Sequence, residues 1–314
     1  MAQVVCGSRL LRCNRMVTSY VSAREPLVLQ HEAETNPEIE ASAKVIANRK
    51  LRFRFMRHDG WENALFVHWP VEPAWLAARL PAGLEPDLLD GKAWVGLVLL
   101  TERGVAPFLA GRPLSCFAVD HLGANLRTYV RRKGVPGIFF WSLECSSFFA
   151  TRGARCAGIP YFRSDMSRTT DVDRPVEVGN VPIDPDFVFR FASVRRGSCL
   201  RKGQPRVSAQ WRVRKEESES TEEMRLFKER ARFFVERYSV FADWTLQQID
   251  CCGPLLLRGD VQHPPWHVHR AALEELDVDS LLAAAGLAGA NTEEPHVGFS
   301  RGVGPVHFWM LEPV

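Results

Sequence analysis

The sequence predicts an α+β protein made mainly of antiparallel strands, with a few helices packed on the sheet. From Trp61 to the C-terminus, short apolar segments alternate with turn residues, and neither an internal repeat nor a long low-complexity linker interrupts them. The chain has 314 residues, of which 46% are hydrophobic, so it is long enough to bury a substantial core. We expect one folded domain over residues 51–314 and a separate N-terminal segment over residues 1–50.

Residues 1–50 differ in composition from the remainder. No acidic residue precedes Glu25, whereas Arg9, Arg12, Arg15 and Arg24 alternate with Ser and apolar residues, as in organelle transit peptides. A disordered tail has a similar composition. We expect a cytoplasmic protein, or a mitochondrial or plastid one if this segment is a transit peptide.

The first elements of the folded part are a strand, a short helix and a hairpin. The stretch "ALFVHWP" predicts a strand with two distinct faces, which carry Leu65, Val67 and Trp69 on one side and Phe66 and His68 on the other. Pro73 is a favoured first-turn residue and predicts a short helix. Asp90-Gly91 between two apolar stretches predicts a hairpin turn.

The second half of the chain predicts a helix, three strands, a long helix and mixed terminal elements. A helix over residues 146–158 and strands over 161–168, 187–196 and 205–214 follow in sequence. The clearest helix spans residues 218–238, where Ser220 and Glu223 form a capping box. After it we expect a strand over 255–261, a helix near 270–286, and strands over 296–302 and 305–311.

The hairpin "NLRTYVRRKGVPGIFFWSLE" has an unusually polar face. If the turn closes symmetrically with Arg131 opposite Ile138, one face carries three cross-strand pairs, Tyr129 with Phe140, Arg127 with Ser142, and Asn125 with Glu144. Arg127 and Glu144 are then diagonal neighbours. A one-residue slip would exchange the faces, so this pairing is a working assumption. The face suits the wall of a closed sheet around a small ligand, or a solvent-facing ion pair.

Several stretches of the chain resemble the YqjF-like proteins, an uncharacterised family of the acetoacetate decarboxylase-like superfamily. The matching stretches run in order from residue 61 to residue 314 and include "LFVHWPVEPAWLAARLPAGLEPDLLDGKAWVGLV", the hairpin, "GIPYFRSDM", "FFVERYSVF", "GDVQHPPW" and "LLAAAGL". The resemblance implies antiparallel sheets curled into a cone or barrel around an internal pocket. It implies no particular activity.

The superfamily's decarboxylases use a Schiff-base lysine in a motif similar to Gly-x-Pro-Lys-Lys, and this lysine is absent here. The best placement of the motif is "GIPYF", where Tyr161 and Phe162 stand in the lysine positions. The seven lysines of the chain lie in the N-terminal segment, beside glycines in turns, in a charged stretch or on the exposed side of the long helix. None has the apolar or cationic surroundings that imine chemistry requires, so we expect no imine-forming decarboxylation.

Two histidine-containing segments offer weaker signals. "HPPWHVH" contains His263, His267 and His269, and the last two could point the same way as metal ligands, but no further ligand is adjacent and we predict no metal site. His263 and Trp266 of "HPPW" are predicted to contact the ligand. His121 follows Asp120 before the hairpin, where we expect a loop histidine or an acid/base residue near Glu144.

Composition excludes several other classes of partner. Forty basic and 37 acidic residues give a net charge of +3, which is too small to recruit nucleic acid or an anionic membrane. The longest apolar runs fall short of the roughly 20 residues that cross a bilayer. Eight cysteines lack metal-binding spacing and are expected to be reduced thiols. We expect a soluble protein.

The leading hypothesis is a protein that acts on or binds a small acidic or carbonyl metabolite in the barrel pocket. Arg127 would bind the carboxylate, and Glu144 would serve as acid/base or fix Arg127. Tyr161 and His68 are the other predicted catalytic residues, and the further predicted ligand contacts are Asn125, Ser142 and Tyr129. Such acid/base chemistry, as in a lyase, isomerase or hydratase, needs no cofactor. The alternatives are a non-catalytic binding module and a structural protein in which Arg127 and Glu144 hold the hairpin. Exposed strand edges also make a homo-oligomer plausible.

Overall fold

The computed structural model describes residues 54–109, 112–156, 159–170, 187–197, 203–214, 220–243, 256–309 and 311–314. The N-terminal segment over residues 1–50, with its transit-peptide prediction, lies outside the described residues, as does Met310 within the last predicted strand. The described residues all fall within one compact unit.

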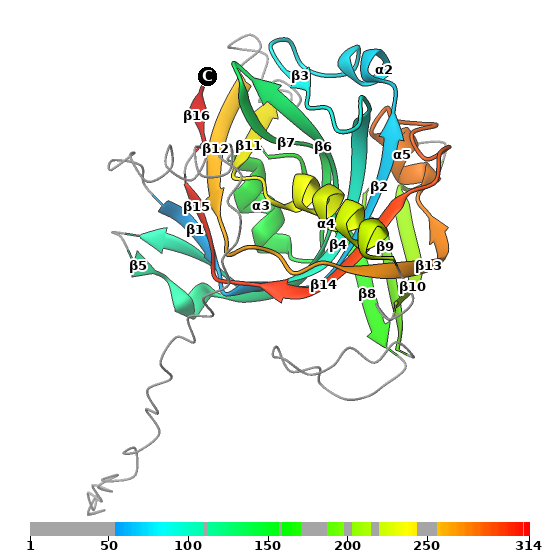
Figure 1. Ribbon diagram of the computed structural model, residues 1–314. Coiled ribbons are helices and arrows are strands. Elements are labelled where there is room, and N and C mark those ends of the chain that lie inside the picture. Colours follow the sequence, from blue (N-terminus) through cyan, green and yellow to red (C-terminus); the bar gives the residue numbers. More distant parts are fainter. Residues whose placement is uncertain are drawn as a thin grey trace, which may run out of the picture. The chain divides into compact units, whose positions relative to one another are not determined.

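Strands make up most of the described structure (Figure 1). The first eight are β1 Arg54–His58, β2 Gly60–Val71, β3 Glu85–Pro86, β4 Ala93–Leu109, β5 Arg112–Pro113, β6 Val119–Arg132, β7 Val135–Cys145 and β8 Tyr161–Thr170. The other eight are β9 Val188–Arg195, β10 Arg206–Val213, β11 Ser239–Asp243, β12 Leu256–Gln262, β13 His269–Asp277, β14 His296–Val303, β15 Val306–Trp309 and β16 Glu312–Pro313. Neighbouring strands are antiparallel, except that β7 runs parallel to both β8 and β11.

Strand pairing closes the sheet into two rings that share β4, β6 and β7. The first ring runs β7-β8-β9-β10-β13-β14-β2-β4-β6 and returns to β7. The second ring runs β4-β1-β15-β12-β11-β7-β6 and returns to β4. Because side chains alternate along a strand, the shared strands present one face to each ring. The predicted α+β architecture of curled, mainly antiparallel sheets is confirmed.

The first ring encloses the main apolar core. Leu97 of β4, Leu126 of β6 and Trp211 of β10 are fully buried there, together with side chains from the other strands of that ring. On β4, the alternate residues Val98 and Leu100 belong to a different cluster and face the second ring. Burial of large side chains such as these contributes about 1.5–3 kcal/mol each to folding.

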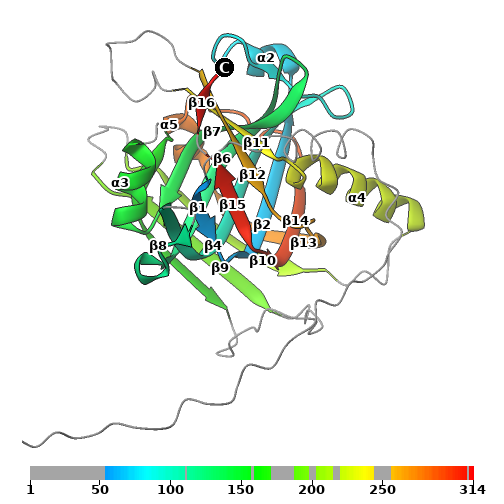
Figure 2. The ribbon, with the colours of Figure 1, turned by 90° about the vertical axis from the view of Figure 1, so that its left-hand side faces the viewer.

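Four α-helices and one 3-10 helix are described. They are α2 Pro73–Ala77, η1 Ser115–Phe117, α3 Phe148–Cys156, α4 Thr221–Val235 and α5 Asp279–Ala284. Figure 2 shows α3 and α4 on opposite sides of the strands. The capping box of α4 is confirmed, because Ser220 Oγ accepts from the Glu223 amide and Glu223 Oε2 accepts from the Ser220 amide, both at 3.2 Å. Phe234, near the end of α4, is fully buried.

Two local predictions require correction. The helix expected near residues 270–286 is strand β13 up to Asp277, followed by the short helix α5. Pairing of β13 with β10 overrides the helical propensity of this Ala- and Leu-rich stretch. The Asp90-Gly91 turn exists, with φ angles of 55° and 74°, but it closes a single bridge between Leu89 and Lys92. The preceding β3 pairs instead with β6.

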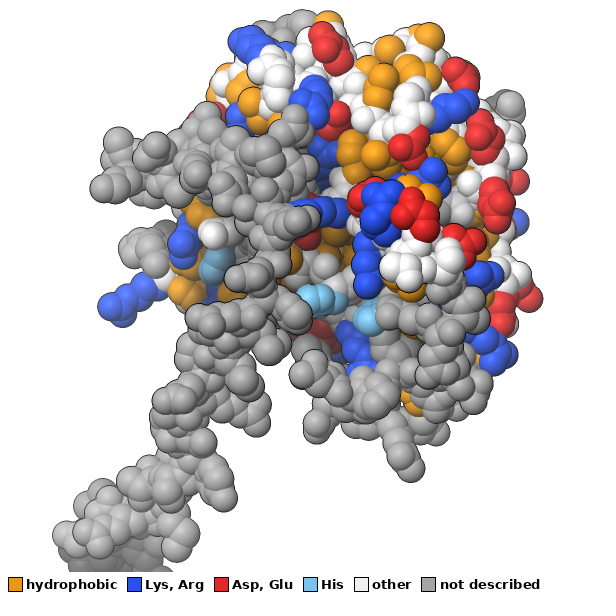
Figure 3. Space-filling model, viewed as in Figure 1, with side chains coloured by type: hydrophobic (Ala, Val, Ile, Leu, Met, Phe, Trp, Pro, Cys, Tyr) orange, Lys and Arg blue, Asp and Glu red, His pale blue; other side chains and the backbone are white. Residues whose placement is uncertain are grey.

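Charged side chains of both signs lie on the surface of the described residues. On the face shown in Figure 3, basic and acidic side chains of the described residues are interspersed. Several form ion pairs, such as Arg230 with Asp90 at 2.9 Å. No helix in the described ranges is long and apolar enough to span a bilayer.

Candidate functional site

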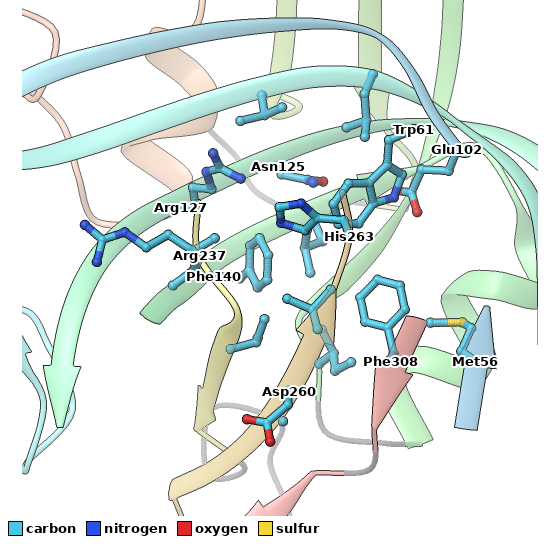
Figure 4. A pocket seen from close by; sticks show the side chains of 18 of the residues that line it. Met56, Trp61, Glu102, Asn125, Arg127, Phe140, Arg237, Asp260, His263 and Phe308 are labelled. Atoms are coloured by element: carbon cyan, nitrogen blue, oxygen red, sulfur yellow. The ribbon is translucent and has the colours of Figure 1, made fainter. Parts of the chain in front are cut away.

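A cavity of about 90 Å³ lies inside the second ring (Figure 4). Its wall is mostly apolar, and Trp61 and Trp266 stack against each other there with ring centroids 5.8 Å apart. Phe66 meets Trp266 edge to face at 5.2 Å. The polar residues of the wall are Glu102, Asn125, Arg127, Tyr161, Arg237, Asp260 and His263. An apolar enclosure with a few polar groups is typical of a small-molecule site.

Arg127 of β6 is buried beside the cavity and is held by two neutral groups. Its Nε donates to the Tyr129 hydroxyl at 3.1 Å, and its Nη2 donates to the Phe234 carbonyl at 3.0 Å. The guanidinium also lies 5.9 Å from the centre of the Phe66 ring. Among the described residues no carboxylate forms an ion pair with Arg127, and its Nη1 group has no hydrogen-bond partner.

The second arginine of the cavity wall, Arg237, is compensated. Its Nη1 lies 2.5 Å from Asp87 Oδ2, and its Nε donates to the Phe233 carbonyl at 2.7 Å. Arg131 also reaches Asp87, at 2.6 Å from Nε. The positive charge of Arg237 is therefore already matched by Asp87, whereas no carboxylate of the described residues pairs with Arg127.

His68 and Tyr129 lie behind Arg127 and orient it. The Tyr129 hydroxyl accepts from Arg127 Nε–H and shares a second hydrogen bond with His68 Nε2, which is 2.7 Å away. Burial, followed by the nearby Arg127 and His296, lowers the pKa of His68 well below its usual value, so the ring is neutral. His68 and Tyr129 are fully buried and do not line the cavity.

Glu102 of β4 forms a second polar group in the cavity wall. Its Oε2 lies 3.1 Å from His58 Nδ1, and the same nitrogen accepts a hydrogen bond from Trp61 Nε1 at 2.9 Å. Burial raises the pKa of Glu102 above its usual value. The nearby His121 and a hydrogen bond from Trp61 lower this pKa, but by less. Burial also lowers the pKa of His58 to about 3, so His58 is a neutral partner.

Tyr161 and His121 lie close to Glu102. Tyr161 of β8 lines the cavity, and burial, reinforced by Glu102 and Cys145, raises the pKa of its phenol well above the usual value. His121 pairs with Glu102 across β6 and β4, and its Nδ1 is 3.5 Å from Cys145 Sγ. His121 is therefore a buried strand residue and not the loop histidine that we expected.

His263 completes the polar part of the wall. Its Nδ1 must donate to the Pro264 carbonyl, 2.9 Å away, since a carbonyl can only accept. Burial lowers the pKa of His263, which keeps the imidazole neutral. The ring lies 5.8 Å from Trp61 and 4.9 Å from Tyr238, so aromatic neighbours fix its position.

The predicted pairing of the β6–β7 hairpin was wrong, and the error separates Arg127 from Glu144. The turn is the two-residue Lys133-Gly134, which places Arg131 opposite Pro136. A bulge then shifts the partners, so that Arg127 faces Phe140 while Leu126 faces Ser142. One extra residue on β7 reverses the faces beyond it. Ser142 and Glu144 therefore point into the first ring.

Glu144 is enclosed in the first ring by a complete set of donors. Ser142 Oγ lies 2.6 Å from Oε1, Ser164 Oγ lies 2.5 Å from Oε2, and Arg195 Nε lies 3.1 Å from Oε1. Glu144 is 2% exposed. The predicted diagonal ion pair between Arg127 and Glu144 does not form, and Arg195 of β9 takes the place of Arg127.

The structure thus divides the predicted site residues into three groups. Those that line the cavity are Arg127, Asn125, Tyr161, His263 and Trp266; those that lie behind Arg127 are His68 and Tyr129; and those in the first ring are Ser142 and Glu144. Sequence reasoning missed Glu102, Trp61 and Arg237. The signal for Glu102 was a charged residue at the end of the long apolar run of β4, in "LVLLTERG".

A family model matches residues 58–304 of the chain and describes the family, DUF2071, as an uncharacterized conserved protein. The chain belongs to the DUF2071 family. One relative of the chain is the uncharacterized protein YqjF of Bacillus subtilis (strain 168). It is 30% identical over 230 residues, which cover 72% of this chain and 80% of that protein.

Solved structures show that this DUF2071 protein has the acetoacetate decarboxylase-like fold. The enduracididine biosynthesis enzyme MppR, complexed with pyruvate, matches with a TM-score of 0.55 and 14% identity, over 85% of this chain and 92% of that chain. An acetoacetate decarboxylase-like enzyme from Sphingomonas wittichii RW1 matches with a TM-score of 0.52 and 13% identity, over 83% and 94%. At these identities the likeness concerns the fold.

Proposed function

We propose that this DUF2071 protein binds a small metabolite with a carboxylate or carbonyl group in the second-ring cavity and acts on it by acid/base chemistry without a Schiff-base lysine. The observation that carries the proposal is the buried guanidinium of Arg127, which has no carboxylate partner among the described residues. The described residues of the wall include no lysine. MppR, which shares the fold, was solved with pyruvate.

The physical argument rests on the cost of burying a charge. A guanidinium taken out of water is strongly destabilised unless an anion or several acceptors replace the water. Arg127 is 8% exposed and has two neutral acceptors, so its remaining donors are available to an anion in the cavity. A carboxylate fits because a planar guanidinium binds it through two parallel hydrogen bonds. The aromatic walls would hold the apolar part of the ligand.

Binding of carboxylates to the full chain tests the proposal. We expect a panel of keto, hydroxy and unsaturated carboxylic acids to include members that raise the melting temperature, because a ligand that binds only the folded state stabilises it. Arg127→Met should abolish that stabilisation, while Arg127→Lys, which keeps the charge but not the planar fork, should weaken it. The measurement is a thermal shift confirmed by calorimetric titration.

Tyr129→Phe is the matched control for this experiment. It removes the hydroxyl that joins Arg127 to His68 but leaves the charge of Arg127 unchanged. We expect this variant to melt at a lower temperature yet to keep carboxylate binding within about tenfold, the effect of roughly one hydrogen bond. If no acid binds the wild type, or if Arg127→Met binds as well as the wild type, the proposal fails.

A further inference from the structure

The cavity has two polar ends that lie far apart along β4. Near one end the Arg127 guanidinium lies over the Phe66 ring, and Phe66 pairs with Val98. Glu102 is four residues further along the same face of β4, which corresponds to about 13 Å of strand. Figure 4 shows Arg127 and Glu102 on opposite sides of the cavity, with His263 between them.

The Glu102 end is open because residue 123 is glycine. A Cβ atom at Gly123 would lie 2.8 Å from Glu102 Oε1 and 3.7 Å from Asn125 Oδ1. The carboxyl of Glu102 and the amide of Asn125 therefore converge over the bare backbone of Gly123. Any larger residue at this position would displace the carboxyl group.

Glu102 has the surroundings of a proton-transfer group. Its ionisable neighbours are His58 from β1, His121 from β6, Cys145 from β7 and Tyr161 from β8. His58 cannot neutralise it as a cation, because the lone pair of His58 Nδ1 is occupied by the Trp61 N–H group. Burial raises the pKa of Glu102 against the opposing effect of His121, and a carboxylate with a raised pKa is a stronger base than an ordinary one.

We propose that Glu102 is the proton-transfer residue of the cavity, and that the ligand is an elongated oxo acid with its carboxylate at Arg127 and its carbonyl at Glu102 and Tyr161. The inference rests on the proposed function and adds to it the class of ligand and the reacting group.

The proposed step is an enolisation. The Glu102 carboxylate removes a proton from the carbon beside the carbonyl, the C–H electron pair forms a C=C bond, and the carbonyl π electrons move to the oxygen. The Tyr161 O–H donates a hydrogen bond to this oxygen, and Glu102 then returns the proton to carbon. The step is redox-neutral and needs no second reactant. The high pKa of Tyr161 keeps it protonated as a donor.

The separation of the two ends sets the length of the ligand. Of the roughly 13 Å of strand, about 3 Å at each end is taken up by a hydrogen-bond contact, which leaves about 7 Å for the ligand. In pyruvate the carboxylate and carbonyl carbons are bonded directly, so one molecule cannot reach both ends. An oxo acid with several carbons between the two groups can do so.

Deuterium exchange into oxo acids tests this assignment. The full chain is incubated in D₂O with pyruvate, levulinate or 5-oxohexanoate, and loss of the protons beside the carbonyl is followed by NMR, while titration calorimetry gives the Kd of each acid. We expect exchange to be faster with the two longer acids than with pyruvate. Glu102→Gln should slow exchange by about 10²-fold or more, the usual contribution of a general base, and leave the Kd nearly unchanged.

Two further variants test whether proton exchange depends on the position of the Glu102 carboxyl group. Gly123→Ala, which places a methyl group against Glu102 Oε1, should slow exchange with little change in Kd. Glu62→Gln, which removes a carboxylate of the neighbouring β2 that pairs with Arg103, should exchange as the wild type does. Three outcomes would show that the inference is wrong while the proposed function stands. They are exchange by Glu102→Gln at the wild-type rate, fastest exchange with pyruvate, and binding of the acids through Arg127 without exchange. If no acid binds at all, both are wrong.

Discussion

At the scale of single residues, hydrogen-bond partners distinguish two buried carboxylates that look alike in the sequence. Glu102 and Glu144 are both buried strand residues, with exposures of 4% and 2%. Glu144 is satisfied by two serine hydroxyls and Arg195, whereas Glu102 lies between the neutral His58, the protonated His121 and an open cavity. A carboxylate with a full set of donors stabilises the fold, and one that faces a cavity can exchange a proton.

Glu144→Gln should lower the stability of the protein without affecting ligand binding. The substitution leaves the largely buried guanidinium of Arg195 without its anion, which costs about 3–5 kcal/mol. Urea unfolding measures the loss, and carboxylate titration of the folded variant should give the wild-type Kd. Asp165→Asn, which breaks the exposed pair with Arg196, is the matched control and should change stability much less. A Glu144→Gln variant with wild-type stability but weakened carboxylate binding would show instead that Glu144 belongs to the binding site.

At the scale of elements, helix α4 and the β6–β7 hairpin together fix Arg127. The hairpin supplies the guanidinium, and the end of α4 supplies the Phe234 carbonyl that accepts from it. The capping box was predictable because it depends on residues three positions apart. The bulge of the hairpin was not, since it depends on which side chains each ring must bury.

Ser220→Ala should destabilise α4 by about 1 kcal/mol. The substitution removes the hydroxyl that accepts from the Glu223 amide at the start of the helix. Chemical denaturation measures the change. Ser220→Asp, which can still accept this hydrogen bond and suits the helix dipole, should restore stability. Equal stabilities of the alanine and aspartate variants would contradict the role of the cap.

At the scale of the whole molecule, buried histidines make stability depend on pH in opposite directions. Burial lowers the pKa of His58 to about 3 and that of His296 to about 4. Burial alone would lower the pKa of His121 too, but Glu102 and Cys145 beside it raise the value to about 9. His58 and His296 are therefore neutral in the folded protein at neutral pH, whereas His121 is protonated.

Stability should be greatest near pH 6.5 and fall on both sides. Below 6.5 the unfolded chain protonates His58 while the folded protein does not, so acidification down to about pH 3 favours unfolding. Between 6.5 and about 9 the folded protein retains the His121 proton that the unfolded chain loses, so a rise in pH lowers stability. Each fully effective group contributes about 1.4 kcal/mol per pH unit.

Urea unfolding across this pH range, with two variants, checks each flank. His58→Gln should flatten the dependence on the acid side, and His121→Gln should flatten it on the alkaline side. If both variants keep the wild-type slopes, these histidines do not control the stability of the fold.

The fold class, the family and the cap of α4 could be predicted from the sequence, and Arg127, Tyr161 and His263 were among the residues expected at the pocket. These depend on local patterns or on the ordered stretches that resemble the family. The tertiary structure alone decided that Glu144 belongs to the core and Glu102 to the cavity. The period of two along a strand fixes which residues share a face, but the faces of β4, β6 and β7 acquire their roles only when strands far apart in the chain close the two rings.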